Sequence, residues 1–99
     1  MLRLIRRTTE VGEAAGLDVC VCGEMASQPL TAYALVGLGV RQLSVAARSV
    51  PVVKRLIRGI SVRDAQLAAT AAMEASTAAE AEAELRQRLR HTLGAVSFL

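Results

Sequence analysis

Only two short segments of this sequence have the pattern of β-strands, and this limits the fold more than any other feature. Residues 17–22, LDVCVC, are apolar with β-branched residues at alternate positions, and Gly23 bounds them. Residues 42–46, QLSVA, form the second segment. A helical segment that begins at Pro29 and runs to about Gly37 separates the two. This order of strand, helix and strand predicts two parallel strands joined by a right-handed crossover.

Two parallel strands are too few to make a stable sheet. Parallel sheets are normally covered on both faces and contain more strands. Both edges of a two-stranded sheet would also remain open for pairing. The sequence therefore predicts an incomplete α/β unit, which is either part of a larger α/β domain or a chain that completes its sheet with copies of itself.

Helices are expected on both sides of this unit. Residues 2–15 carry an apolar stripe at helical spacing, and Gly16 is placed to end that helix. Residues 49–59 begin with a serine and a proline and end at a glycine, which predicts a further helix. The stripe of the first helix consists of Leu4, Thr8, Val11 and Ala15.

Beyond residue 60 the sequence predicts a pair of helices. Ser61 with Asp64, and Thr77 with Glu80, resemble capping boxes, in which a hydroxyl at the helix start accepts a hydrogen bond from the backbone three residues later. The apolar stripe of the last helix consists of Ala81, Leu85 and Leu89, followed by Thr92 or Leu93.

Composition and charge exclude several classes of protein. The 99 residues suit one domain, and a chain that is 53% hydrophobic and 2% aromatic is globular with an aliphatic core. The net charge of +3 is scattered, so nucleic-acid binding is not expected. The longest apolar run, residues 29–40, is too short to span a bilayer, and the N-terminus has no secretory signal. These features, with only two cysteines, predict a soluble cytoplasmic protein that binds neither nucleic acid nor membrane.

Cys20 and Cys22 are candidates for a disulfide, a metal site or a functional group at a strand end. On a strand they point to the same face, with Cα atoms about 6.6–6.8 Å apart and parallel Cβ directions, so a disulfide is not expected. A zinc site needs three or four ligands, and the single histidine, His91, lies far away in the last helix. No metal site is therefore expected in this chain.

The third alternative depends on where strands end. In α/β barrels and open α/β sheets, active groups sit at the carboxyl ends of the strands, and Cys22 is the last residue of its strand. Cys20 lies one layer deeper on the same face and is expected to pack within the sheet. The competing interpretation is that both are ordinary small buried residues. Glu24, just past the strand end, could accept a hydrogen bond near a ligand or cap the next segment.

Several stretches carry a family resemblance. They are residues 19–26 (VCVCGEMA), Pro29-Leu30, 35–40 (LVGLGV), 43–45 (LSV) and 49–54 (SVPVVK). In this order they resemble the C-terminal end of the phosphoenolpyruvate-binding barrel of Enzyme I, the phosphoenolpyruvate–protein phosphotransferase of the bacterial sugar phosphotransferase system. The resemblance runs ungapped from about residue 2 to residue 60, with a similar helical tail beyond.

The resemblance implies a fold and a role. The chain would be the last part of a (β/α)8 TIM barrel: residues 1–60 would be its last β/α units and residues 61–99 its C-terminal helices. Cys22 matches the family's proton donor to the enolate carbon of phosphoenolpyruvate, with Gly23 and Glu24 beside it as weaker candidates for substrate binding. A free thiol, with a pKa near 8.5, is mostly protonated at neutral pH and can donate.

The resemblance also implies partners that act elsewhere. Mg²⁺ would be held by carboxylates from earlier strands, and the phosphorylated histidine would lie in a separate domain. The phosphoryl group would pass to a histidine-containing phosphocarrier protein. None of these groups maps onto this chain, which is expected to bind no cofactor and to lack phosphotransfer activity alone. The sequence departs from the family pattern at Ser27-Gln28, where Gly-Asp is usual, and at Val45-Ala46, where Met-Ser is usual.

Two other functions remain open at this point. The chain could be a non-catalytic oligomerisation module derived from the same barrel, and the family's barrel domain is where Enzyme I dimerises, so a homo-oligomer is expected. A small helical nucleic-acid binder built on residues 61–93 is the third alternative, and it would require salt-dependent affinity for DNA.

Overall fold

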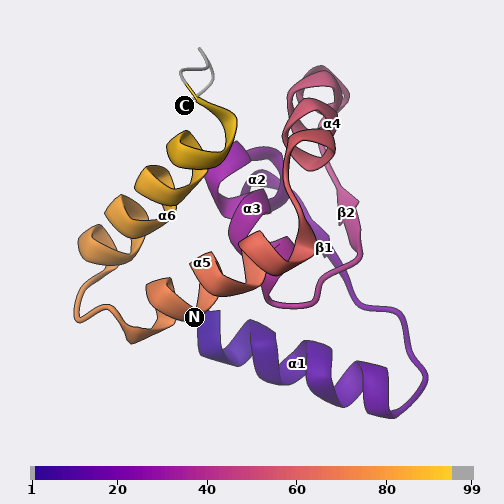
Figure 1. Ribbon diagram of the computed structural model, residues 1–99. Coiled ribbons are helices and arrows are strands. Elements are labelled where there is room, and N and C mark those ends of the chain that lie inside the picture. Colours follow the sequence, from indigo (N-terminus) through magenta and orange to yellow (C-terminus); the bar gives the residue numbers. More distant parts are fainter. Residues whose placement is uncertain (1, 95–99) are drawn as a thin grey trace.

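The computed structural model describes residues 2–94, and Figure 1 shows their arrangement. The predicted order of helix, strand, helix, strand and three helices is confirmed, with one short helix that the sequence did not suggest, α2. The elements are α1 (Leu2–Ala14), β1 (Cys20–Cys22), α2 (Glu24–Ser27), α3 (Pro29–Gly37), β2 (Gln42–Ser44), the 3-10 turn η1 (Ala47–Ser49), α4 (Val50–Gly59), α5 (Val62–Glu74) and α6 (Ala78–Leu93). Residues 95–99, the last part of the predicted C-terminal helical segment 61–99, lie outside the described residues.

The two strands are parallel neighbours, as expected, and belong to an α/β fold. Cys20 pairs with Gln42 and Cys22 with Ser44. Each strand is three residues long, shorter than the predicted segments 17–22 and 42–46. The difference has a physical reason: within the described residues each strand has one neighbour, so regular pairing stops where that single neighbour turns away.

The faces of this sheet are unequal. Val21 and Leu43, the middle residues of the strands, are half-buried, and Leu43 packs against the main core. The other face carries four side chains that are all exposed, those of Cys20, Cys22, Gln42 and Ser44. One face of the sheet is therefore covered by helices, and no described residue covers the other.

Helix α3 is the centre of the core. It lies between the strands and the α5–α6 pair, and it contacts α4, α5 and α6 (Figure 1). Small residues let α5 approach α3 closely: Gly37 faces the backbone of Ala65, and alanines line the buried side of α5. The largest fully buried side chains are Tyr33, Leu35, Leu56, Leu89 and Val40.

The carboxylate of Asp64 joins helices α3, α5 and α6. The Tyr33 hydroxyl donates to Asp64 Oδ2 at 2.8 Å, and the Thr92 hydroxyl donates to the same oxygen at 2.9 Å. Tyr33 is completely buried, and this burial, followed by the bond to Asp64, raises the pKa of its phenol. Because the three residues come from α3, α5 and α6, the carboxylate fixes how the terminal helix pair sits on α3.

Both predicted helix caps are present. The Ser61 hydroxyl accepts a hydrogen bond from the backbone N–H of Asp64 at 3.0 Å, and the Thr77 hydroxyl accepts one from the N–H of Glu80 at 3.1 Å. The Glu80 carboxylate in turn accepts from the N–H of Ser76 at 3.0 Å. These bonds satisfy backbone donors that a helix start leaves without partners, which explains why α5 and α6 begin where they do.

The predicted helix α1 is confirmed, but the stripe noted in its sequence is not the side that packs. Leu4 and Val11 are 70% and 51% exposed. The buried side carries Thr9 and Gly12 instead. The Thr9 hydroxyl donates a hydrogen bond to the carbonyl oxygen of Leu38 at 3.0 Å. The apolar stripe of α1 thus has no covering segment among residues 2–94.

No helix in the described part of the chain is long and apolar enough to cross a bilayer.

The contact between α3 and α5 yields a test with a matched control. Alanine is normally preferred to glycine in a helix by about 1 kcal/mol. A Cβ on Gly37 would overlap the Ala65 carbonyl group, so Gly37→Ala is expected to lower the free energy of unfolding by about 1–3 kcal/mol. At Gly59, the last residue of α4, a Cβ would meet the end of the Leu93 side chain, which can rotate away. Gly59→Ala is therefore expected not to destabilise the chain, and to raise its stability by at most about 1 kcal/mol.

Urea denaturation of the two variants and the parent chain measures both changes. A Gly37→Ala chain that is as stable as the parent would contradict the close approach of α3 to α5.

Candidate functional site

The end of β1 is shaped by Gly23. Its φ of 85° and ψ of −152° place it in a region of backbone space that only glycine occupies without strain. A Cβ there would meet nothing within 4 Å, so the requirement is one of conformation and not of space. This turn stops the strand directly after Cys22 and starts α2 at Glu24, which leaves the Cys22 side chain at the carboxyl end of the strand.

Ser27 joins the carboxyl ends of the two strands. Its hydroxyl donates to the carbonyl oxygen of Gly23 at 3.1 Å and accepts from the backbone N–H of Ala46 at 3.2 Å. The N–H of Gly23 also donates to the carbonyl oxygen of Ser44 at 3.2 Å. The glycine usual in the resembling family has no hydroxyl at this position. Ser27, which departs from the family pattern, therefore links the carboxyl ends of the two strands, and the sequence alone does not indicate this role.

The two thiols lie on the uncovered face of the sheet. Cys20 and Cys22 are both free and exposed, and their sulfur atoms are 3.9 Å apart, within hydrogen-bonding range for thiols. This separation is far longer than the 2.05 Å of a disulfide bond. The prediction that Cys20 packs within the sheet is wrong for this chain, because no described residue covers that face. Desolvation raises the pKa of the Cys20 thiol, and its hydrogen bond with Cys22 raises it further.

Gln42 and Ser44 share this face with the cysteines. The register places Gln42 beside Cys20 and Ser44 beside Cys22, so two polar side chains flank the two thiols. The pattern of 42–46 predicts a strand. Its alternation of side chains, combined with that of 17–22, contains the signal that groups these residues on one face.

Glu24 is exposed in the first turn of α2 and makes no hydrogen bond or ion pair with the described residues. It therefore presents a free carboxylate just past the end of β1. No group of three or more histidine, cysteine, aspartate or glutamate side chains within residues 2–94 is arranged to hold a metal ion.

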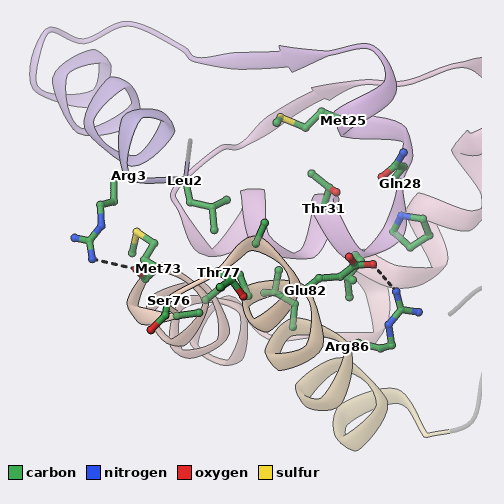
Figure 2. A pocket seen from close by; sticks show the side chains of 17 residues that line it. Leu2, Arg3, Met25, Gln28, Thr31, Met73, Ser76, Thr77, Glu82 and Arg86 are labelled. Atoms are coloured by element: carbon green, nitrogen blue, oxygen red, sulfur yellow. Dashed lines mark hydrogen bonds and ion pairs between the residues drawn. The ribbon is translucent and has the colours of Figure 1, made fainter.

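A groove of about 670 Å³ lies beside this site and was not foreseen from the sequence. Figure 2 shows Met25 and Gln28 on the side of α2, Arg3 and Met73 at one end, and Glu82 with Arg86 at the other. Arg3 donates to the Met73 carbonyl oxygen at 3.0 Å, and Arg86 pairs with Glu82 at 2.7 Å. Apolar side chains from α1, α3 and α6 form the walls: Leu2, Leu30, Ala81 and Leu85. Met25 thus places the groove next to α2, the helix that follows Cys22 and Gly23.

The family of this segment follows from comparison with known proteins. Residues 1–62 match the model of the PEP-utilising enzyme, PEP-binding domain family. The chain belongs to this family. The match includes both strands, Cys22, Gly23 and Glu24, together with helices α1 to α4. The family relationship suggested by the sequence motifs is therefore confirmed.

Curated relatives agree with this assignment. A "Phosphoenolpyruvate-dependent phosphotransferase system" protein of Salmonella typhimurium is 45% identical over 80 residues, which is 81% of this chain and 11% of that protein. An Escherichia coli protein with the same description is 40% identical over 80 residues, again 81% of this chain and 11% of that protein.

A "Phosphoenolpyruvate-protein phosphotransferase" of Streptomyces coelicolor is 40% identical over 81 residues, or 82% of this chain and 15% of that protein. The chain thus corresponds to a small part of each of these relatives.

The Ser27 tie can be tested against a neighbouring serine. Ser27→Ala removes a hydroxyl that bonds to Gly23 and Ala46, so the variant is expected to lose about 1 kcal/mol of stability. Ser44→Ala is the control, because the exposed Ser44 hydroxyl makes no hydrogen bond with the described residues. Urea denaturation should separate the two variants. Equal stability of the two would show that the hydroxyl does not hold the strand ends together.

Proposed function

We propose that this chain is the C-terminal part of the barrel domain of a phosphoenolpyruvate–protein phosphotransferase. The observation that supports this most strongly is the uncovered sheet face that carries Cys20, Cys22, Gln42 and Ser44. In a closed (β/α)8 barrel one face of every strand points inward and the other meets the helices. A two-strand sector cut from such a barrel would have this pattern of one covered and one bare face.

The other open surfaces fit the same sector. In a barrel, β1 and β2 would each pair with a further strand along the edge that is now open. Helix α1, at one margin of the sector, would pack its exposed Leu4 and Val11 against the helix that precedes it in the barrel. In this proposal residues 1–60 are the last β/α units, and residues 61–99 are C-terminal helices that cover α3 from outside.

The proposed reaction begins with phosphoenolpyruvate and a histidine from a separate domain. The histidine takes the phosphoryl group from phosphoenolpyruvate, which leaves the enolate of pyruvate. Cys22 then gives its thiol proton to the enolate carbon, so a C–H bond forms, an S–H bond breaks and pyruvate is released. The thiolate regains a proton from solvent. The free thiol of Cys22 at the carboxyl end of β1 supports this role, because active groups of barrels lie at that end.

The residues after Cys22 would act by position. Gly23 allows the chain to turn away at once, which keeps the thiol at the end of the strand. Glu24, with its free carboxylate, would stand at the mouth of the site near bound substrate. Mg²⁺ would neutralise charge on the phosphoryl oxygens when bound, and the proposal assigns none of its ligands to residues 2–94. The phosphorylated histidine would pass its phosphoryl group to a histidine-containing phosphocarrier protein in the cytoplasm.

A non-catalytic oligomerisation module is the second candidate. It is favoured by the open strand edges and by the groove between α2 and α6, which are the kinds of surface that a second copy of the chain could cover. Light scattering at several concentrations distinguishes the candidates for the isolated chain. A well-folded monomer at all concentrations would exclude self-association.

A chimera tests the proposed role of Cys22. The segment of the Salmonella relative that matches this chain is replaced by this chain, and phosphoenolpyruvate-dependent phosphorylation of the phosphocarrier protein is measured with Mg²⁺. The chimera is expected to be active, whereas the chain alone should form no phosphorylated product. Cys22→Ala should lower turnover by about 100-fold or more, the usual contribution of a proton donor. Cys20→Ala, on the same strand and face, is the matched control and should retain turnover.

Two results would contradict the proposal. One is full turnover of the Cys22→Ala chimera, which would remove the proton-donor role. The other is phosphorylation of the carrier by the chain alone, which would show that the described site is complete without the rest of a barrel.

A further inference from the structure

The proposed reaction uses one thiol, but the uncovered face presents two. Cys20 has no part in the proton transfer assigned to Cys22. Its sulfur lies 3.9 Å from that of Cys22, both thiols are exposed, and the strand backbone holds both side chains on one face. The position of Cys20 therefore has a chemical consequence of its own.

The separation of the two sulfur atoms fits a bridge through one further atom. It is too long for an S–S bond. A three-coordinate pyramidal centre with bonds of about 2.3 Å to sulfur holds two sulfur atoms roughly 3.4–3.5 Å apart. This is a few tenths of an ångström less than the present separation, a difference that small side-chain rotations close. The two thiols can thus bind one thiophilic atom between them with little movement of β1.

The number of ligands decides which kind of atom fits. A protein zinc site takes three or four protein ligands, and residues 2–94 contain no such group around these cysteines. A trivalent organoarsenic compound needs only two thiols, because its organic substituent fills the third position. We infer that Cys20 and Cys22 form a dithiol site for trivalent arsenicals and that occupation of this site blocks proton donation by Cys22.

The binding step balances without an oxidant or a reductant. An arsenoxide, R–As=O, reacts with two thiols to give R–As(S)₂ and water. Two As–S bonds form, the two S–H bonds and the arsenic–oxygen bond break, and both thiol protons leave in the water molecule. Arsenic remains trivalent and both sulfur atoms keep their oxidation state. Cys22 then has no proton to donate; this consequence for catalysis rests on the proposed function, but binding itself does not.

The first experiment uses phenylarsine oxide and the reduced 99-residue chain. Intact-mass spectrometry counts bound phenylarsenic groups while glutathione, a monothiol, competes for the arsenic. The parent chain is expected to retain one group per chain. Cys20→Ala and Cys22→Ala, which each keep one thiol, should require about 100-fold less glutathione to release the arsenical, because the second As–S bond in the parent forms within the molecule.

Two outcomes of this experiment would overturn the inference. One is equal retention by the parent and both single variants, which would mean that the thiols bind independently. The other is a complex with two chains for each arsenic, which would mean that the bridge forms between molecules.

The second experiment separates this inference from the proposed function. The Cys20→Ala chimera should stay active in phenylarsine oxide and glutathione concentrations that inhibit the unsubstituted chimera. Equal inhibition of both would refute the role of Cys20 in the site. If Cys22→Ala leaves turnover unchanged while the parent chain still retains one arsenical, the proposed function fails and the dithiol site stands.

Discussion

A parallel β-sheet excludes water from both of its faces in stable proteins, and this requirement governs the arrangement described here. The middle residues of the two strands, Val21 and Leu43, are covered by helices. The flanking residues on the other face are all exposed, and they include both cysteines. The same bare face is therefore both the unsupported side of the sheet within residues 2–94 and the candidate site.

The helical side of the molecule is better determined than the sheet. Helix α3 contacts α2, α4, α5 and α6, and the Asp64 carboxylate accepts hydrogen bonds from Tyr33 and Thr92 where α3, α5 and α6 meet. At the carboxyl ends of the strands, Ser27 ties Gly23 to Ala46. The chain thus holds the end of β1 in place from the helical side, while the opposite side of the sheet has no support within residues 2–94.

Much of this fold could be predicted because local rules decide it. Strand alternation, the proline that begins α3 and the hydroxyls before α5 and α6 act within a few residues of the elements that they define, so the sequence predicts these elements. The packed face of α1 could not be predicted in the same way. Its most apolar stripe, with Leu4 and Val11, lies open, and a small pair, Thr9 and Gly12, packs instead. Hydrophobic spacing predicts which residues favour burial, but not whether a covering segment is present.

In the candidate site, too, features set by neighbouring residues could be predicted, and features set by distant segments could not. Cys22 and the strand end at Gly23 followed from the order of residues along the chain. The exposure of Cys20 could not be predicted, because it depends on the absence of cover from residues 2–94. The bridging hydroxyl of Ser27 could not be predicted either, because it bonds to Ala46, which is distant in sequence. The family match covers both the predicted and the unpredicted parts of the site, since the matched region contains both strands and their carboxyl ends.

Amide hydrogen exchange tests most directly whether the bare sheet belongs inside a larger one. The measurement compares the amides of residues 20–22 and 42–44 in the isolated chain and in the chimera with the Salmonella relative. The barrel account predicts that amides on the open strand edges exchange rapidly in the isolated chain and become strongly protected in the chimera, where new strands pair with them. Equal protection in the two proteins would contradict it, because the sheet would then gain no neighbours from the rest of the chimera.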